Sequence, residues 1–368
     1  MSGHSNATEA MLTRLTYFDA ARALTGHGRR IDAIREGANA LRAALLTGGR
    51  VVAVRSLPLS RLLYPTKYAF QGAAASPFPF VVMTHRCLLV QFMQRGALKT
   101  LLFNPTDVER ARATPFFTRM LAGMPAFAEE LVAPKYPTLE AQLEDHGVKA
   151  EDVDYLAFDH FHTQDLRRLL GTTNGEYGAR FPNARLLAPR TEWDDWDRLH
   201  PMQRAWFVAD GKQGVDMRRV VLTDGDHLLG DGVALVRTPG HTSGNQTLFV
   251  STEKGIWGCA ENGTCADNYA PLDSRIAGIR RHARMYDVDL VMNMNTPELG
   301  AEQYTSMTLE RTVVDRVPRA PAFVQMFCSS EVTPSALAPG LAPTIVFGHL
   351  TTGTPIAKRA AVTASATL

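Results

Sequence analysis

Apolar and polar residues follow two different periods along this chain. Over residues 8–48, Leu, Ile and Ala recur at spacings of three and four positions, which predicts an N-terminal helical segment. From about residue 50, short apolar runs bounded by Pro and Gly take over and predict β-strands. Two of them, residues 78–92 and 98–107, are close enough to predict a β-hairpin. His85 lies inside the first run, where we expect a structural role.

In the middle of the chain, predicted helices alternate with predicted strands. A helical pattern stops at Gly147 and leads, after a short turn, into an apolar strand that ends at His160 and His162. Residues 181–196 read as strand then helix, and residues 274–295 as helix then strand. This order places the two histidines at the carboxyl end of a strand, where sheets flanked by helices usually hold their sites.

Three segments of the chain differ in composition and in their hydrophobic pattern. We expect an N-terminal helical extension over residues 1–50, one folded domain over 51–310, and a loosely held, partly irregular C-terminal extension over 311–368, which is rich in Pro, Ala, Thr and Ser. Within the domain, residues 115–127 carry a Met- and Phe-rich face. This face, like the cluster of Trp193, Trp196, Trp206 and Phe207, predicts either core packing or the wall of an apolar pocket.

Composition excludes several classes of partner. The 39 Lys and Arg residues balance 37 Asp and Glu residues, and no basic run with interleaved aromatic residues predicts a nucleic-acid surface. The N-terminal residues lack the pattern of a secretory signal, and no apolar run reaches the length of a membrane span. We therefore expect a cytoplasmic protein that does not bind membranes.

The histidines of the middle region predict a metal site. Residues at i and i+2 of an extended segment point the same way, so His160 and His162 can reach one ion. A third imidazole, from His241, would complete a three-ligand site with one open position, as in catalytic zinc sites. Gly240 and Gly244 flank His241 and would let the backbone approach the ion closely.

With these motifs in place, the chain resembles the metallo-β-lactamase-fold hydrolases, in particular their lactonase-like and glyoxalase-like members. The helix, strand and "DHFHTQD" loop resemble the helix, strand and HxHxDH loop of that family, and "TPGHTSGN" resembles its second histidine motif. The resemblance covers about residues 80–300. It implies an α+β fold, an αββα sandwich with the site at one edge of its two sheets, and it implies that His160, His162 and His241 bind a first metal.

The second metal of the family lacks its usual ligands in this chain. Gln164 stands at the Asp position of HxHxDH, Asp165 at its last His position, and Asn295 in place of the late His. Cys259 stands at the bridging-acid position and is a candidate zinc ligand, with a buried structural thiol as the alternative. Glu261 follows closely as a candidate base or a turn residue. Asp165 is either a catalytic carboxylate or a cap of the following helix.

Two functional hypotheses follow. The first is a metal-dependent hydrolase of an ester, lactone or thioester, in which one zinc ion activates water and Asp165 or Glu261 acts as the base; iron is the other candidate metal. The second is a protein of the same fold that has lost hydrolysis and serves as a ligand-binding or structural protein. The expected partner is a partly apolar small molecule. The terminal extensions could cover the site or form a homodimer.

Overall fold

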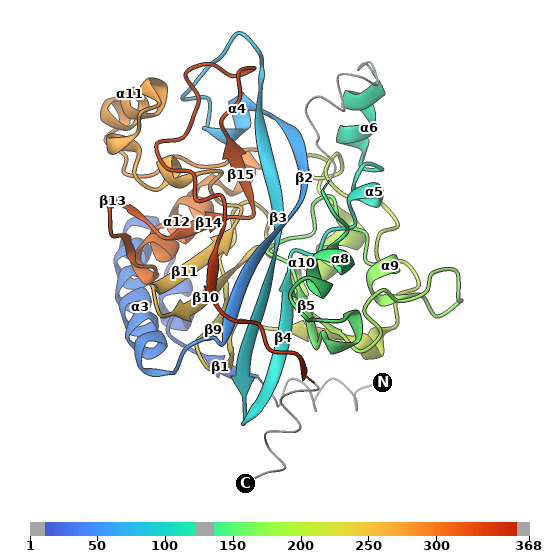
Figure 1. Cartoon of the computed structure of the whole chain (residues 1–368). Helices are drawn as coiled ribbons and strands as arrows, with labels where there is room; N and C mark the ends of the chain where they lie inside the picture. The colour runs from blue at the N-terminus through green and yellow to red at the C-terminus, as the bar shows by residue number, and fades with distance from the viewer. Residues whose placement is uncertain (1–11, 123–135, 359–368) are drawn as a thin grey trace.

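Two β-sheets lie face to face at the centre of the protein (Figure 1). The computed structural model describes residues 12–122 and 136–358. One sheet has six strands, β1 (Thr13–Leu15), β8 (Asp226–Gly230), β9 (Val233–Arg237), β10 (Gln246–Thr252), β11 (Gly255–Ala260) and β14 (Met326–Cys328), in that spatial order. The second has eight: β16 (Thr351–Gly353), β2 (Ala53–Pro65), β3 (Phe80–Gln94), β4 (Ala97–Phe103), β5 (Tyr155–Ala157), β6 (Arg185–Pro189) and β7 (Val220–Thr223) in order, with β15 (Ser330–Thr333) paired to β3.

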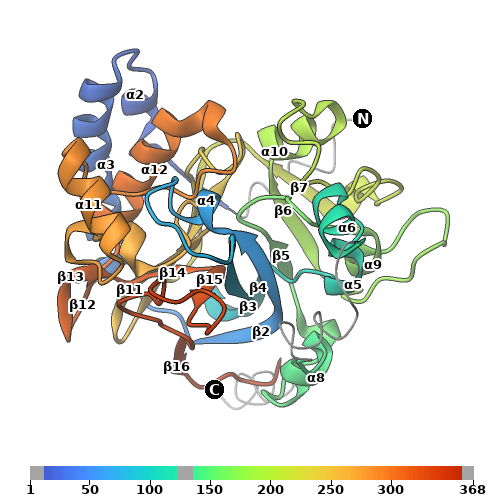
Figure 2. The same cartoon turned by 90° about the horizontal axis from the view of Figure 1, so that it is seen from above.

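Helices cover the outer face of each sheet, as the view from above shows (Figure 2). The helices beside the six-stranded sheet are α2 (Asp19–Arg22), α3 (His27–Thr47), α11 (Ala277–Tyr286) and α12 (Gly300–Val313). The helices beside the eight-stranded sheet are α5 (Val108–Ala111), α6 (Pro115–Ala122), α8 (Leu139–Glu144), α9 (Arg167–Leu170) and α10 (Arg190–Asp195), while α4 (Thr66–Ala69) follows β2. Among these helices of the described residues, none combines the length and hydrophobicity that a membrane span requires.

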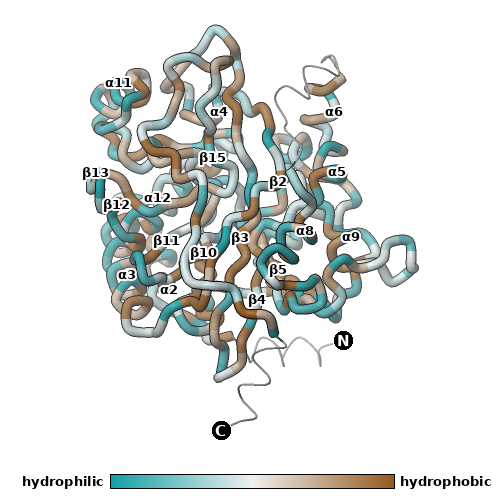
Figure 3. Tube along the Cα trace, viewed as in Figure 1, coloured by the Kyte–Doolittle hydropathy of each residue, from teal (hydrophilic) through white to brown (hydrophobic). Residues whose placement is uncertain are grey.

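Alternating side chains of the strands hold the layers together. Along β3, Val90 and Phe92 pack with Leu235 and Leu248 of the other sheet in a core between the two sheets, whereas Leu89 faces the outer helices. Because successive residues of a strand point to opposite faces, a strand buried on both sides is apolar at almost every position. The tube coloured by hydropathy shows apolar stretches along the central strands (Figure 3).

The helices add an outer layer on each side. Ile34 and Leu41 of α3 pack with Met307 of α12 against Phe249 of the six-stranded sheet, and Leu143 of α8 belongs to the cluster on the other outer face. The resulting order is helix, sheet, sheet, helix. The predicted αββα sandwich is therefore confirmed.

Several local predictions can now be compared with the structure. Residues 78–107 form the predicted hairpin, β3 and β4, with Arg95 and Gly96 at positive φ in the turn. The continuous helix expected over residues 8–48 is wrong in part, because residues 13–15 pair with β8 as strand β1 and the long helix begins at residue 27. Residues 1–11 lie outside the described chain.

The C-terminal segment is more closely bound than its composition predicted. The strands β14, β15 and β16 pair with β11, β3 and β2, so the segment adds to both sheets. Loose attachment is therefore wrong for residues 326–328, 330–333 and 351–353, which pair with strands of the two sheets. The division of the chain at residues 50 and 310 stays a prediction.

Candidate metal centre

Two loops at one edge of the sandwich bring three histidines together. His160 and His162 lie in the loop that follows β5, and His241 lies in the loop between β9 and β10. Phe158, two positions before His160, and Phe161, directly before His162, enter the core of the outer face. The three imidazoles lie together, with ring centroids 4.4–4.9 Å apart.

The spacing of the three imidazoles suits one metal ion. One ring nitrogen from each of His160, His162 and His241 can be chosen so that all lie within 4.8 Å of one another, and all three residues are buried. Nδ1 of His162 lies 3.2 Å from Nε2 of His241. Nitrogens bound to one tetrahedral zinc at about 2.0–2.1 Å would be roughly 3.3–3.4 Å apart, so this pair is already close to the required separation.

His160 is oriented by the residue that precedes it. Its Nδ1 lies 2.7 Å from Oδ1 of Asp159, and Asp159 is held in turn by Nδ2 of Asn104 at 3.0 Å and by the hydroxyl of Ser329. Burial opposes charge on His160, but the carboxylate outweighs burial and raises the pKa of the imidazole. With Nδ1 donating to Asp159, Nε2 of His160 is available for a metal.

A different pair of residues fixes the ring of His162. The side-chain amide of Gln203 donates from Nε2 to Glu298 at 2.8 Å, so its oxygen is the acceptor that faces Nε2 of His162 at 2.6 Å. His162 therefore carries its proton on Nε2, and its Nδ1 lone pair points toward His241. Burial, and then the nearby His160, lower the pKa of His162 well below its usual value, which keeps the ring neutral.

His241 is bound from the other side by Asn293. Oδ1 of Asn293 accepts the Tyr64 hydroxyl at 2.6 Å, so its Nδ2 faces Nδ1 of His241 at 3.2 Å as a donor. In this arrangement His241 carries its proton on Nε2 and donates it toward His162. Burial and the neighbouring histidines lower the pKa of His241. A metal at Nε2 requires the other tautomer, with the proton on Nδ1.

One buried carboxylate ties the two histidine loops together. Oε1 of Glu192, in α10, accepts the backbone N–H of Phe161 at 2.8 Å, and Oε2 accepts that of Gly244 at 3.1 Å. A Cβ at Gly244 would lie 2.4 Å from the backbone nitrogen of Glu192. Gly244 therefore allows the loop to pack closely on α10. The sequence predicts instead that this glycine allows the backbone to approach an ion.

Asp165 does not reach the centre. Its carboxylate accepts from the Arg167 guanidinium at 2.6 Å, from Nε of Arg110 at 2.9 Å, and from the backbone N–H of Arg167 at the start of α9. Burial opposes the charge, but these donors outweigh it and lower the pKa of Asp165. Because its oxygens are occupied by arginines, the prediction of a catalytic role for Asp165 is corrected. The alternative is met only in part, since Asp165 accepts the backbone N–H of Arg167 but the N-cap of α9 is Leu166.

Cys259 is also placed elsewhere. It lies on β11 opposite Leu248 and belongs to the core between the sheets. Burial, followed by the nearby Asp159 and Glu261 carboxylates, raises the pKa of the thiol well above its usual value. Cys259 is not part of the three-histidine group, so the structure favours the buried thiol over the zinc ligand.

Glu261 does lie near the histidines. It lines the same cavity, and its Oε1 accepts the backbone N–H of Ser330. Burial and Asp159 raise the pKa of Glu261 to about 8. Its catalytic role stays a prediction.

The remaining residues of the expected second site offer only weak ligands. Gln164 and Asn295 are buried and line the cavity, and their amide oxygens have no hydrogen-bond partner among the described residues. Neutral amide oxygens are poor zinc ligands compared with imidazole or carboxylate. Since Asp165 is occupied by arginines, the good metal ligands are the three histidines, and the positions of the expected second site that face the cavity offer neutral amide oxygens.

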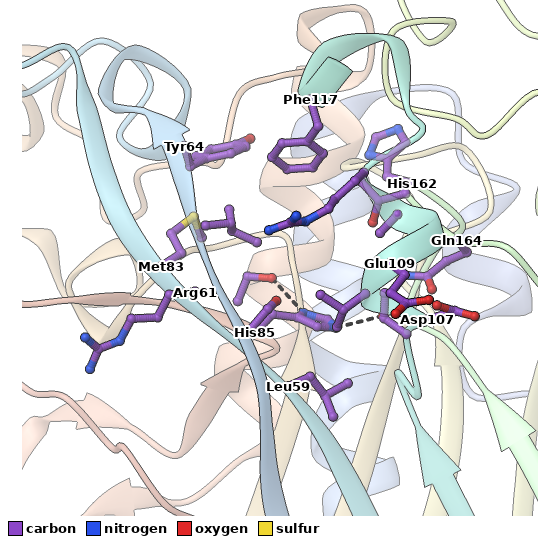
Figure 4. A pocket seen from close by; sticks show the side chains of 18 of the residues that line it. Leu59, Arg61, Tyr64, Met83, His85, Asp107, Glu109, Phe117, His162 and Gln164 are labelled. Carbon is purple, nitrogen blue, oxygen red and sulfur yellow. Dashed lines mark hydrogen bonds between the residues drawn. The ribbon is translucent and has the colours of Figure 1, made fainter. Parts of the chain in front are cut away.

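The histidines open onto a cavity of about 540 Å³. Figure 4 shows His162 and Gln164 on one side of it, Tyr64 and Met83 on the other, and Phe117 of α6 above. Most of the wall is apolar. The part of the predicted apolar face that the structure describes, residues 115–122, contributes to this wall; residues 123–127 lie outside the described chain.

The aromatic cluster divides between core and cavity. Trp206 lines the cavity and stacks on Phe116 at a ring-centroid distance of 4.4 Å, whereas Trp193, Trp196 and Phe207 are buried in the outer core.

Four residues that hold the histidines were missed in the sequence: Asp159, Glu192, Gln203 and Asn293. Only Asp159 gave a local signal, as the residue directly before His160.

Comparison with known proteins gives similar architectures at low sequence identity. No family model and no curated protein matches the chain. A probable metal-dependent hydrolase from Staphylococcus aureus is 14% identical, with 64% of this chain and 84% of that chain covered and a TM-score of 0.47. A quorum-quenching N-acyl homoserine lactone lactonase is 18% identical, with 65% and 89% covered and a TM-score of 0.42. A hydrolase of the beta-lactamase superfamily is 13% identical, with 84% and 98% covered and a TM-score of 0.44.

These three TM-scores lie below 0.5. The layers described above, two sheets between helices with the histidine loops at one edge, are those of the metallo-β-lactamase sandwich that the sequence resemblance implied.

Proposed function

We propose that the protein is a hydrolase of an ester, lactone or thioester that uses a single metal ion. The observation that carries this proposal is the group of three buried imidazoles beside a largely apolar cavity, with two ring nitrogens 3.2 Å apart. His160, His162 and His241 would hold the ion. Zinc suits three neutral imidazoles, and iron is the alternative.

The protein groups around the ion have separate tasks. Bound zinc supplies Lewis acidity toward a carbonyl group and lowers the pKa of water. Asp159 and Gln203 hold the first two imidazoles in the required tautomers. The carboxyl group of Glu261 lies in the same cavity and can exchange a proton with the reacting groups.

The cavity wall supports a partly apolar substrate. Apolar side chains reach it from β2, from β3 and from α6: Leu59, Leu62, Met83, Phe117, Met120 and Leu121. An acyl group or an apolar alcohol would remove this surface from water, which favours binding by roughly 25 cal/mol per Å² buried.

The test is metal binding linked to activity. The protein is purified without added metal, assayed for metal content, and titrated with zinc while thermal unfolding is followed. We expect zinc to raise the melting temperature of the wild type and to leave the melting temperature of His241→Ala unchanged. We also expect the hydrolysis of an ester, lactone or thioester to require the metal. Equal zinc responses in both proteins, or hydrolysis unaffected by chelation, would exclude the proposal.

One observation favours the second candidate, a metal-free ligand-binding protein. The rings of His241 and His162 form a continuous hydrogen-bond chain from Asn293 to Gln203, so both are satisfied without an ion. If zinc has no effect on unfolding while an apolar ester binds without turnover, this candidate replaces the hydrolase.

A further inference from the structure

A second group of polar side chains lines the same cavity. His85 of β3 and Ser330 of β15 are directly opposite each other in the antiparallel pair, and Nδ1 of the imidazole lies 3.0 Å from the serine hydroxyl. Nε2 of His85 lies 2.8 Å from the hydroxyl of Thr106, which follows β4. All three residues line the cavity, and Figure 4 shows the two hydrogen bonds at His85 as dashed lines.

The ring of His85 is held so that one nitrogen faces the serine. Thr106 binds the Nε2 side, and the ring also hydrogen-bonds to the backbone of Asn104. These contacts leave Nδ1 toward Ser330. Burial, as the main cause, lowers the pKa of His85 to about 4, so the ring is neutral near pH 7 and one of its nitrogens carries a lone pair.

Ser330 is also fixed relative to the metal centre. Its backbone N–H donates to Glu261, and its hydroxyl oxygen lies within hydrogen-bond reach of both the Glu261 carboxyl group and Nδ1 of His85. Cross-strand pairing with His85 and the Glu261 contact therefore hold the hydroxyl beside the cavity that the three histidines share. A hydroxyl next to a base that a third group orients is the arrangement of serine nucleophiles in acyl transfer.

We infer that Ser330 is a nucleophile that accepts the acyl group of the substrate, with His85 as its general base and Thr106 as the residue that positions His85. The inference rests on the proposed hydrolase function and goes beyond it, because it assigns a covalent intermediate to a side chain.

The proposed reaction has two balanced steps. The Ser330 oxygen bonds to the carbonyl carbon of an ester, and its proton passes to Nδ1 of His85. The bond to the leaving alkoxide oxygen then breaks as that oxygen takes the proton from His85 and leaves as the alcohol. Water then attacks the Ser330 ester. His85 takes a proton from the water and returns it to the serine oxygen, which releases the carboxylic acid and regenerates the free hydroxyl.

The experiment uses two probes on the full-length, zinc-loaded protein. A fluorophosphonate reports the nucleophile directly, because the serine oxygen displaces fluoride and the product is located by peptide mass spectrometry. p-Nitrophenyl acetate reports turnover, and a burst of about one equivalent of p-nitrophenolate marks an accumulating acyl-enzyme. We expect both the label and the acetyl group on the peptide that contains Ser330.

Variants separate the roles. We expect Ser330→Ala to abolish the label and the burst, and His85→Gln to slow acylation at least about 100-fold while the hydroxyl remains present. Thr333→Val is the matched control, because it removes a hydroxyl from the same strand. The Thr333 hydroxyl hydrogen-bonds to that of Thr84, and Thr333 is not among the residues that line the cavity. The control should keep the label and the burst.

Failure of this inference is distinguishable from failure of the proposed function. Absence of label on wild-type Ser330, or zinc-dependent hydrolysis that Ser330→Ala retains within about threefold, overturns the nucleophile and leaves the metal hydrolase intact. If His241→Ala loses zinc-dependent activity while Ser330 is still labelled, the assignment of Ser330 as nucleophile is supported.

Discussion

Gln203 decides which nitrogen of His162 is free, although it is far from the histidine motifs in the sequence. Its amide oxygen accepts the proton of Nε2 because its own N–H is bound to Glu298. Partners that orient a metal-binding imidazole contribute about 10- to 100-fold in metal affinity. We therefore expect Gln203→Leu to weaken zinc binding by a factor in this range, measured by competition with a chromogenic chelator.

Gln213 offers the control for that measurement. It lies in the same region on an exposed stretch of chain. Gln213→Leu should leave the zinc affinity within about twofold, since exposed substitutions away from a site have little effect. Equal affinities in the wild type and Gln203→Leu would show that the ring of His162 is fixed by its packing alone.

The sequence was sufficient to find the three histidines and insufficient to find their neighbours. His160, His162 and His241 were recognisable because two short motifs carry them. Asp165 was misassigned, because its oxygens are taken by Arg110, 55 positions earlier, and by Arg167. Contacts of this kind depend on the packing of separate elements, and no local pattern encodes them.

Among the elements, the C-terminal strands were the least predictable. β15 pairs with β3, which lies about 240 positions earlier, and β16 pairs with β2 at a still larger separation. Their short length and Pro-rich surroundings give no periodic pattern. The hairpin of β3 and β4, by contrast, has its two strands and its Arg95-Gly96 turn within one stretch, so the sequence predicted it.

A buried carboxylate holds this segment in place. Glu331 of β15 lies 3.2 Å from Arg86 and accepts the backbone N–H groups of Phe347 and Gly348. Removing one partner of a buried ion pair costs about 3–5 kcal/mol because the other charge stays buried. We expect Glu331→Ala to lower the free energy of unfolding by an amount in this range in urea denaturation.

The same edge provides a matched control. Glu253 is exposed, and its carboxylate accepts from Thr352 at 3.3 Å. Glu253→Ala should change the free energy of unfolding by less than about 0.5 kcal/mol. A separate early transition in Glu331→Ala, with the main transition unchanged, would mean that the C-terminal segment unfolds independently of the sandwich.

For the molecule as a whole, buried acids shape the dependence of stability on pH. Burial is the main cause that raises the pKa of Glu192, Glu261, Glu310 and Glu331 above the ordinary range. A folded state that binds protons more tightly than the unfolded chain loses stability as pH rises through the interval between the two pKa values. These four acids therefore make the sandwich less stable at pH 8 than at pH 5, whereas the lowered pKa values of His85, His162 and His241 act in the opposite direction.

Glu310 allows this effect to be isolated. It lies in α12 outside the cavity, where Tyr269, Asn262 and Thr247 donate to its carboxylate at 2.7, 2.8 and 2.7 Å. Burial raises its pKa from 4.5 to about 7 despite these donors. A difference of this size corresponds to about 3 kcal/mol of stability, present below pH ~4.5 and lost as pH rises to ~7.

Glu310→Gln removes the titration and keeps the shape of the side chain. We expect the free energy of unfolding of the variant, relative to the wild type, to increase by about 3 kcal/mol between pH 4.5 and 8 in urea denaturation. Thr247→Val provides a second test, since loss of one donor should raise the pKa of Glu310 further and move the interval to higher pH. Parallel pH profiles for Glu310→Gln and the wild type would contradict the linkage, because a carboxyl group that does not change its proton affinity on folding contributes no pH dependence.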